Sequence, residues 1–203
     1  GHISIDNRYE IEMLEKAASS LKKKQPVIMR INLDVGAETH PMVLTSGYDQ
    51  QFGISISFAE KALNQIASSK SLLFSGIHVH IGSQILNDAP FRKTLNVMSK
   101  LIKELKLNLK YVDLGGGFGI NYTDKEKPIN LSKYSRLVYN FSKKLNCKII
   151  FEPGRSIIGN TGLLITKIQF IKKGTNKNFV ILDAGMNDFM RPALYEAFHK
   201  IIP

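Results

Sequence analysis

The sequence predicts an α/β fold, in which a parallel sheet or barrel of strand–helix units is followed by an antiparallel β region. Short runs of β-branched residues alternate with stretches of helical periodicity. Three predicted strands end near residues 83, 114 and 151, a spacing of about 35 residues that fits successive βα units. Beyond Gly159, two apolar runs follow each other without a helix between them, which indicates antiparallel strands.

Local signals mark the individual elements. Asn7 with Glu10, and Ser57 with Glu60, have the spacing of capping boxes, which begin helices. Apolar side chains recur every three or four residues over two later segments, as expected of helices with one buried face. In chain order, we expect a helix over 7–24, a strand over 27–33, a helix over 57–69, a strand over 76–83, a helix over 91–105, a strand over 110–114, a helix over 131–145, a strand over 148–151, and β runs over 162–170 and 179–183.

Length and composition bound the architecture. The chain has 203 residues, of which 43% are hydrophobic, enough for a real core. We divide it where the pattern changes, into an α/β barrel portion over 1–160 and the start of a β domain over 161–203, which is too short to close a second domain. The single cysteine, Cys147, excludes an internal disulfide, and no signal peptide or membrane-length apolar run is present, so we expect a cytoplasmic protein.

The net charge of +11 invites a nucleic-acid interpretation, which the residue types do not support. Lysine supplies 22 of the 28 basic residues, mostly where amphipathic helices would face water. No helix-turn-helix, zinc-binding or RNA-binding signature accompanies them. A solvated, lysine-rich surface is the simpler explanation, so we expect no nucleic-acid partner and no membrane.

Residues suited to chemistry end three consecutive predicted strands, and strand ends form the active face of a (β/α)8 barrel. The first strand ends in His78, His80 and Ser83, the second in Gly115–Gly117, and the third in Glu152-Pro-Gly-Arg. Each has a structural alternative. His78 can be a core histidine with satisfied hydrogen bonds, the glycines can form a tight turn, and the last motif can be an ion pair. No carboxylate lies close in sequence to the two histidines, so we expect no metal site.

Taken together, the three strand ends match the needs of a pyridoxal phosphate site. Successive glycines let backbone N–H groups approach a phosphate, and Arg155 is a good phosphate ligand. His80 can stack on a ring, and Glu152 can pair with a protonated ring nitrogen.

Four motifs resemble the diaminopimelate decarboxylase family, which belongs with alanine racemase to the fold-type III pyridoxal phosphate enzymes. The resemblance extends over nearly the whole chain, including Arg30-Ile31-Asn32 and Thr39-His40-Pro41, and implies a partial barrel of alanine-racemase type. The fourth motif points to diaminopimelate in particular. The motifs are Gly-Ile-His-Val-His-Ile-Gly-Ser-Gln (76–84), Val-Asp-Leu-Gly-Gly-Gly-Phe-Gly (112–119), Phe-Glu-Pro-Gly-Arg-Ser (151–156) and Ala-Gly-Met-Asn-Asp-Phe-Met-Arg-Pro-Ala-Leu-Tyr (184–195).

The resemblance implies an activity and a role for each matching residue. The reaction is removal of CO₂ from the D-centre of meso-diaminopimelate, which gives L-lysine with pyridoxal 5'-phosphate as cofactor. Arg155, Arg191 and Tyr195 would bind the substrate. Toward the cofactor, His80 would stack on the ring, Glu152 would pair with its nitrogen, and Ser83, Gly117, Gly154 and Arg155 would hold the phosphate.

The chain also departs from the family pattern. The Tyr-Ala-x-Lys-like motif of the Schiff-base lysine is missing, and so is the catalytic cysteine motif, since Cys147 is interpreted as a core residue. Leu33 stands where the family usually has proline, and Gln51 where it has lysine. The chain therefore resembles the middle of a longer enzyme, and we expect it to be inactive alone.

Two further expectations rest on the resemblance. The family forms homodimers with shared active sites, which implies the same here. A related ornithine, arginine or carboxynorspermidine decarboxylase remains an alternative, as does a non-catalytic fragment that retains only the phosphate cradle.

Overall fold

The computed structural model describes residues 1–33, 35 and 51–203, and it confirms the predicted α/β fold. Its main sheet is parallel, with strands in the order β1-β2-β4-β5-β6 and β3 paired to β2. The strands of this sheet are β1 (Ile3–Ile5), β2 (Gln25–Asn32), β3 (Ile54–Ser55), β4 (Leu72–His78), β5 (Tyr111–Asp113) and β6 (Lys148–Ile150). The main helices are α1 (Arg8–Ser20), α2 (Ile56–Ser68), α3 (Ala89–Glu104) and α4 (Leu131–Leu145).

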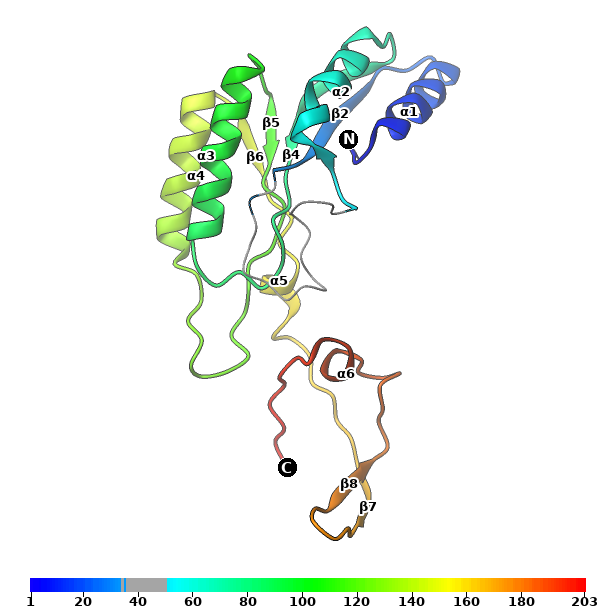
Figure 1. Ribbon diagram of the computed structural model, residues 1–203, viewed down its shortest axis with the longest axis vertical. Helices are drawn as coiled ribbons and strands as arrows, with labels where there is room; N and C mark the ends of the chain where they lie inside the picture. Colours follow the sequence, from blue (N-terminus) through cyan, green and yellow to red (C-terminus); the bar gives the residue numbers. More distant parts are fainter. Residues whose placement is uncertain (34, 36–50) are drawn as a thin grey trace.

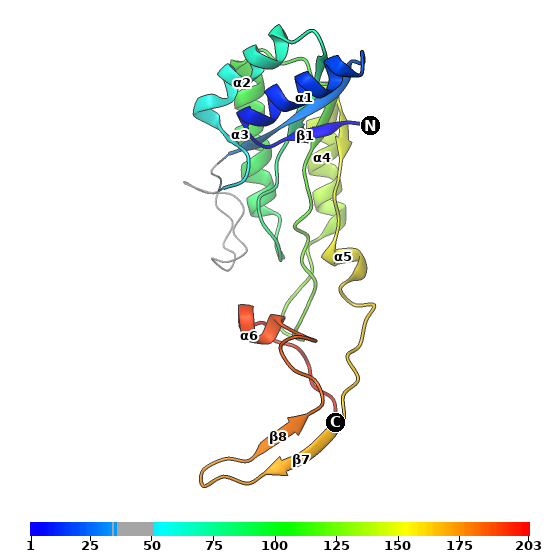
Figure 2. The same ribbon diagram turned by 90° about the vertical axis from the view of Figure 1, so that its right-hand side faces the viewer.

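One apolar core is formed by residues of this sheet and of its helices. Figures 1 and 2 show the helices alongside the sheet. Helices α3 and α4 meet at a ring contact between Phe91 and Tyr134, whose centroids are 4.9 Å apart. The predicted helical stripes are buried for the most part, but Leu21 and Leu131 are exposed, because Leu21 follows the end of α1 and Leu131 is the first residue of α4. The buried members are Ile11, Ala18, Ala59, Ile66, Phe91, Leu95, Met98, Ile102, Tyr134, Val138 and Phe141.

One predicted helix start is confirmed and the other is wrong. Asn7 caps α1, and its Oδ1 accepts hydrogen bonds from the backbone N–H groups of Tyr9 and Glu10 at 3.0 and 3.1 Å. By contrast, α2 begins at Ile56 with Ser55 as N-cap, so Ser57 already lies inside the helix. Because β3 pairs with β2 immediately before this point, the chain enters the helix earlier than the capping-box pattern indicates.

Strand bounds also differ from the prediction. β4 begins at Leu72 and ends at His78, so His80 and Ser83 lie in the loop after the strand and not in the strand. Pairing with β2 on one side and β5 on the other stops at His78. The strand β1 was not predicted, because three residues are too few to show alternation.

The residues after β6 form a smaller region. α5 (Arg155–Ile158) leads to an antiparallel pair, β7 (Ile168–Lys172) and β8 (Phe179–Leu182), and then to α6 (Arg191–Tyr195). The antiparallel prediction is confirmed, although the first run starts later than residue 162. Both views show this hairpin away from the main sheet, and its apolar side chains are largely exposed. In the described part of the chain, no helix is both long and apolar enough to cross a membrane.

Candidate active site

Backbone hydrogen bonds tie together the loops that follow β4, β5 and β6. The Val79 N–H donates to the Asp113 carbonyl at 2.9 Å, and the Glu152 N–H donates to the Gly115 carbonyl at 2.8 Å. Farther out, the Ile85 N–H donates to the Gly117 carbonyl at 2.9 Å. These bonds hold the three predicted strand ends together, because the backbone of each loop is hydrogen-bonded to the backbone of the next.

The glycine loop packs too closely for side chains. Gly115 and Gly117 have φ values of +63° and +95°, which favour glycine. Gly116 has no such φ, but a Cβ on it would lie 2.3 Å from the Glu152 carbonyl oxygen, and one on Gly117 would lie 2.4 Å from that of Gly82. Steric contact therefore requires glycine at Gly116 and Gly117, whose close packing is the local structure that an anion cradle needs.

His80 lies against this loop. Its Nδ1 accepts a hydrogen bond from the Gly116 N–H at 3.3 Å, which places the ring beside the glycine run. Burial and the nearby Arg30 guanidinium lower the pKa of His80, so the ring is neutral at physiological pH. A neutral imidazole at this position presents a flat apolar face next to the cradle.

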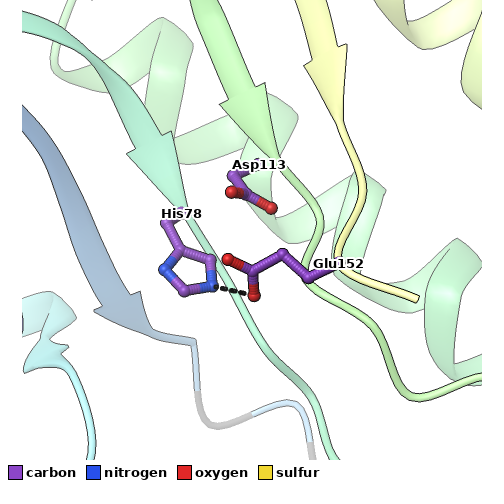
Figure 3. A group of neighbouring side chains, drawn as sticks. All are labelled: His78, Asp113 and Glu152. Carbon is purple, nitrogen blue, oxygen red and sulfur yellow. Dashed lines mark ion pairs between the residues drawn. The ribbon is translucent and has the colours of Figure 1, made fainter. Parts of the chain in front are cut away.

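His78, Asp113 and Glu152 converge from three neighbouring strand ends (Figure 3). The Nε2 of His78 lies 3.5 Å from a Glu152 carboxylate oxygen, and its Nδ1 lies 2.8 Å from the Ser4 hydroxyl of β1. Asp113 accepts a hydrogen bond from the Gly115 N–H at 2.8 Å. Glu152 is a predicted site residue, but no spacing in the sequence indicates that it or Asp113 lies close to His78. The approach comes from the pairing of β4 with β5 and of β5 with β6.

The charges in this cluster perturb one another. Burial lowers the pKa of His78 to about 4, against the opposing influence of Asp113, so its contact with Glu152 at neutral pH involves an uncharged ring. Burial and the Asp113 carboxylate raise the pKa of Glu152. About half of the Glu152 side chain is exposed, so its carboxylate can meet a ligand.

Arg155 is held by two contacts that the sequence did not indicate. Its Nη1 donates to Gln84 Oε1 at 2.9 Å, and its guanidinium lies 6.0 Å from the ring centroid of Tyr122. The Arg191 guanidinium lies 5.5 Å from the same ring and 5.8 Å from that of Tyr195. Tyr122 thus contacts both predicted substrate arginines.

Ser83 and Gly154 are the other two predicted phosphate-binding residues. Ser83 lies in the loop after β4. Gly154 precedes α5, and a Cβ added to Gly154 would meet no atom within 4 Å. The segment Thr39-His40-Pro41 lies outside the described residues. Chemically, the convergent group offers an imidazole nitrogen and two carboxylates, which can pair with a cationic ring or ligate a divalent cation.

Known proteins of one family resemble the chain over nearly its whole length. Residues 1–159 match the family model described as pyridoxal-dependent decarboxylase, pyridoxal binding domain. The chain is 40% identical over 203 residues to the diaminopimelate decarboxylase of Aquifex aeolicus, covering 98% of the chain and 48% of that protein. It is 42% identical over 205 residues to that of Zymomonas mobilis, covering 99% and 49%. The chain therefore spans about half the length of these relatives.

Solved structures agree with the sequence comparison. The crystal structure of a diaminopimelate decarboxylase mutant from Helicobacter pylori, complexed with L-lysine, superposes on the chain with a TM-score of 0.90 and 38% identity. The match covers 97% of this chain and 50% of that one.

Proposed function

The chain belongs to the pyridoxal-dependent decarboxylases, and from that premise we propose that it forms the cofactor and substrate site of a diaminopimelate decarboxylase. The proposed reaction removes CO₂ from the D-centre of meso-diaminopimelate and releases L-lysine. The observation that carries this proposal is the hydrogen bond between the Glu152 N–H and the Gly115 carbonyl. It places a partly exposed carboxylate beside a backbone cradle suited to a phosphate.

The residues present fit pyridoxal phosphate. The glycine loop leaves no room for a Cβ at Gly116 or Gly117, as expected where backbone N–H groups must approach a phosphate. The Nε2 of His78 is buried, and it makes no hydrogen bond among the described residues, although it lies near the Glu152 carboxylate. A polar, partly open cluster next to an anion cradle is what a charged ring with a phosphate arm requires.

When bound, pyridoxal phosphate supplies an electron sink for the electron pair left by the departing CO₂. Glu152 would hold a proton at the ring nitrogen, which strengthens that sink, because an ionised carboxylate stabilises a neighbouring cation. His80 would lie on the ring face. Ser83, Gly117, Gly154 and Arg155 would hold the phosphate.

The part of the site assigned to the substrate contains two arginine side chains. We propose that Arg155 and Arg191 bind carboxylates of the substrate and that Tyr195 helps to hold its far end. Tyr122 supports this proposal, because its ring contacts both guanidiniums and so holds the two positive charges close to each other. A substrate with a carboxylate at its far end would pair with Arg191, whereas ornithine, which has only an amine there, would leave that guanidinium unpaired.

Other parts of the proposal concern the larger protein. We propose that residues 1–160 belong to a barrel domain and 161–203 to a β domain. The family match over 1–159 and the separate antiparallel sheet support this division. We also propose a homodimer with shared active sites, supported by the family resemblance, and a cytoplasmic location, supported by the lone, unpaired cysteine.

A chimera tests the function, because the isolated chain is still expected to be inactive. The aligned 203 residues of the Aquifex aeolicus relative are replaced by this chain, and CO₂ and lysine are measured with meso-diaminopimelate. We expect turnover with this substrate and little with ornithine or arginine. A chimera that binds pyridoxal phosphate but prefers ornithine would contradict the substrate assignment. One that folds and binds no cofactor would contradict the proposed site.

A further inference from the structure

His78 is a buried polar residue at the site that the proposed roles leave unexplained. Only 6% of this residue is exposed, and its ring is placed between the exposed edge strand β1 and the Glu152 carboxylate. A core histidine with satisfied hydrogen bonds would have partners for both nitrogens. Here Nδ1 has the Ser4 hydroxyl at 2.8 Å, whereas Nε2 points at Glu152 from 3.5 Å without a hydrogen bond (Figure 3).

The two carboxylates decide which nitrogen carries the proton. An ionised carboxylate only accepts hydrogen bonds, and a ring nitrogen without a proton would turn its lone pair toward Glu152 and the nearby Asp113. A serine hydroxyl can donate or accept, so Ser4 fits either tautomer. The favourable arrangement therefore has Nε2–H facing Glu152 and the Ser4 hydroxyl donating to Nδ1.

The need for a donor at this point follows from the charges. One ring nitrogen of His78 and one carboxylate oxygen each of Asp113 and Glu152 lie within 4.8 Å of one another, so two carboxylates share a partly buried space. Each disfavours ionisation of the other. Asp113 already accepts the Gly115 N–H, and a donor directed at Glu152 would offset the remaining repulsion.

We propose that His78 is a positioning residue for Glu152: its neutral ring, oriented by Ser4, presents Nε2–H to the carboxylate and keeps it ionised and directed toward the cofactor. This inference rests on the proposed function, since the importance of an ionised Glu152 comes from its partner, the ring nitrogen. It extends the site to β1, because Ser4 would act through His78 without touching the cofactor.

The first test needs no cofactor. Nitrogen-15 NMR of the full 203-residue chain reports the protonation of each nitrogen of the His78 ring. We expect Nε2 to carry the proton at pH 7 and Nδ1 to accept from Ser4. In Ser4→Ala, a substitution on an exposed edge strand, the Nδ1 signal should shift while the ring stays neutral. A proton on Nδ1, or a charged ring, would overturn the proposal.

The second test uses pyridoxal phosphate labelled with nitrogen-15 in its ring. His78→Leu removes the donor, and we expect the protonation equilibrium of the bound ring nitrogen to fall about tenfold, the effect of one lost hydrogen bond to a charged group. His78→Gln, which returns an N–H donor, should recover most of that loss. Phosphate affinity should change less than about twofold in both variants, because the cradle is untouched.

The outcomes separate this inference from the function on which it rests. An unchanged ring nitrogen in His78→Leu would overturn the positioning role, even with cofactor bound. Equal losses in His78→Leu and His78→Gln would also overturn it, since a purely structural role would not distinguish a donor from an alkyl group. Failure of the unaltered chain to bind pyridoxal phosphate would count against the proposed function, and the tautomer measurement would then decide the role of His78.

Discussion

Gln84 Oε1 accepts a hydrogen bond from Arg155 Nη1 at 2.9 Å, although 71 residues separate the two in the chain. The same amide is anchored by Ile120, whose carbonyl accepts from Nε2 at 2.5 Å and whose N–H donates to Oε1 at 3.3 Å. Gln84 thereby connects the loop after β4, the glycine loop after β5 and the arginine after β6. Gln84 supplies the hydrogen-bond acceptor that, together with the Tyr122 ring, holds the Arg155 guanidinium in place.

Replacing Gln84 should therefore weaken phosphate binding at a distance. Gln84→Leu removes the acceptor for Arg155, and we expect the affinity of the chain for pyridoxal phosphate to fall about tenfold, as for loss of one charge-assisted hydrogen bond. Gln84→Glu keeps the acceptor and should retain most of the affinity. Titration calorimetry measures both, and equal affinities for the leucine variant and the unaltered chain would contradict the connection.

Gly116 offers a test of the cradle. A Cβ added there would lie 2.3 Å from the Glu152 carbonyl oxygen, so Gly116→Ala must displace backbone. We expect the affinity for pyridoxal phosphate to fall by more than about tenfold, and the free energy of unfolding to fall by about 1–3 kcal/mol. Gly162→Ala is the matched control, because a Cβ there meets no atom within 4 Å and should change neither quantity. Binding and urea denaturation provide the two measurements.

Glu152→Gln separates cofactor retention from catalysis. A neutral amide cannot stabilise a proton on the ring nitrogen, whereas the phosphate contacts remain. In the chimera, turnover of diaminopimelate should fall by about a hundredfold or more, in the range typical of a lost proton-handling group. Cofactor affinity should stay within about threefold, a change below 1 kcal/mol. Near-normal turnover would rule out the assigned role of Glu152.

Tyr122 should affect substrate binding more than the chemical step. Tyr122→Leu removes the ring that contacts Arg155 and Arg191, and we expect KM for diaminopimelate in the chimera to rise about tenfold, from two cation–π contacts of about 0.5–1 kcal/mol each. Tyr122→Phe keeps the ring and should behave almost normally. Tyr139→Leu is the control for the substitution, since the Tyr139 ring makes the same kind of contact with Lys143, a residue outside the site. A fall in kcat alone would argue against a positioning role.

Stability should depend on pH through His78. Its pKa is lowered from 6.5 to about 4 in the folded chain, mainly by burial, so between these values the unfolded chain binds more protons. The free energy of unfolding should therefore rise with pH across this window, by up to about 3 kcal/mol from His78. This contribution is lost as the pH falls toward 4.

Comparison with His78→Gln isolates that contribution. Glutamine does not titrate, so urea denaturation between pH 4.5 and about 7 should show a flatter dependence in the variant. Glu152, whose pKa is raised, acts in the opposite direction and His80 in the same direction, but both remain in the variant. Identical pH dependences would mean that His78 is not neutral in the folded chain.

Elements with local signals are predicted correctly from the sequence. The stripe from Phe91 to Ile102 is buried as its spacing predicts, and Asn7 caps the first helix, because both depend on contacts within a few residues. The glycine run was recognisable for the same reason. Where a local signal competed with strand pairing it was misleading, as at Ser57, which lies inside α2.

Which side chains meet depends on contacts between segments that are far apart in the chain. His78 contacts Ser4, 74 residues away, and faces Glu152, also 74 residues away in the other direction. Neither contact can be recognised from residue spacing or periodicity. Parallel pairing of β4 with β5, and of β5 with β6, aligns their carboxyl ends, and that alignment converts three separate motifs into one charged cluster. The sequence contains the polar side chains, and the strand register sets the distances at which these side chains interact.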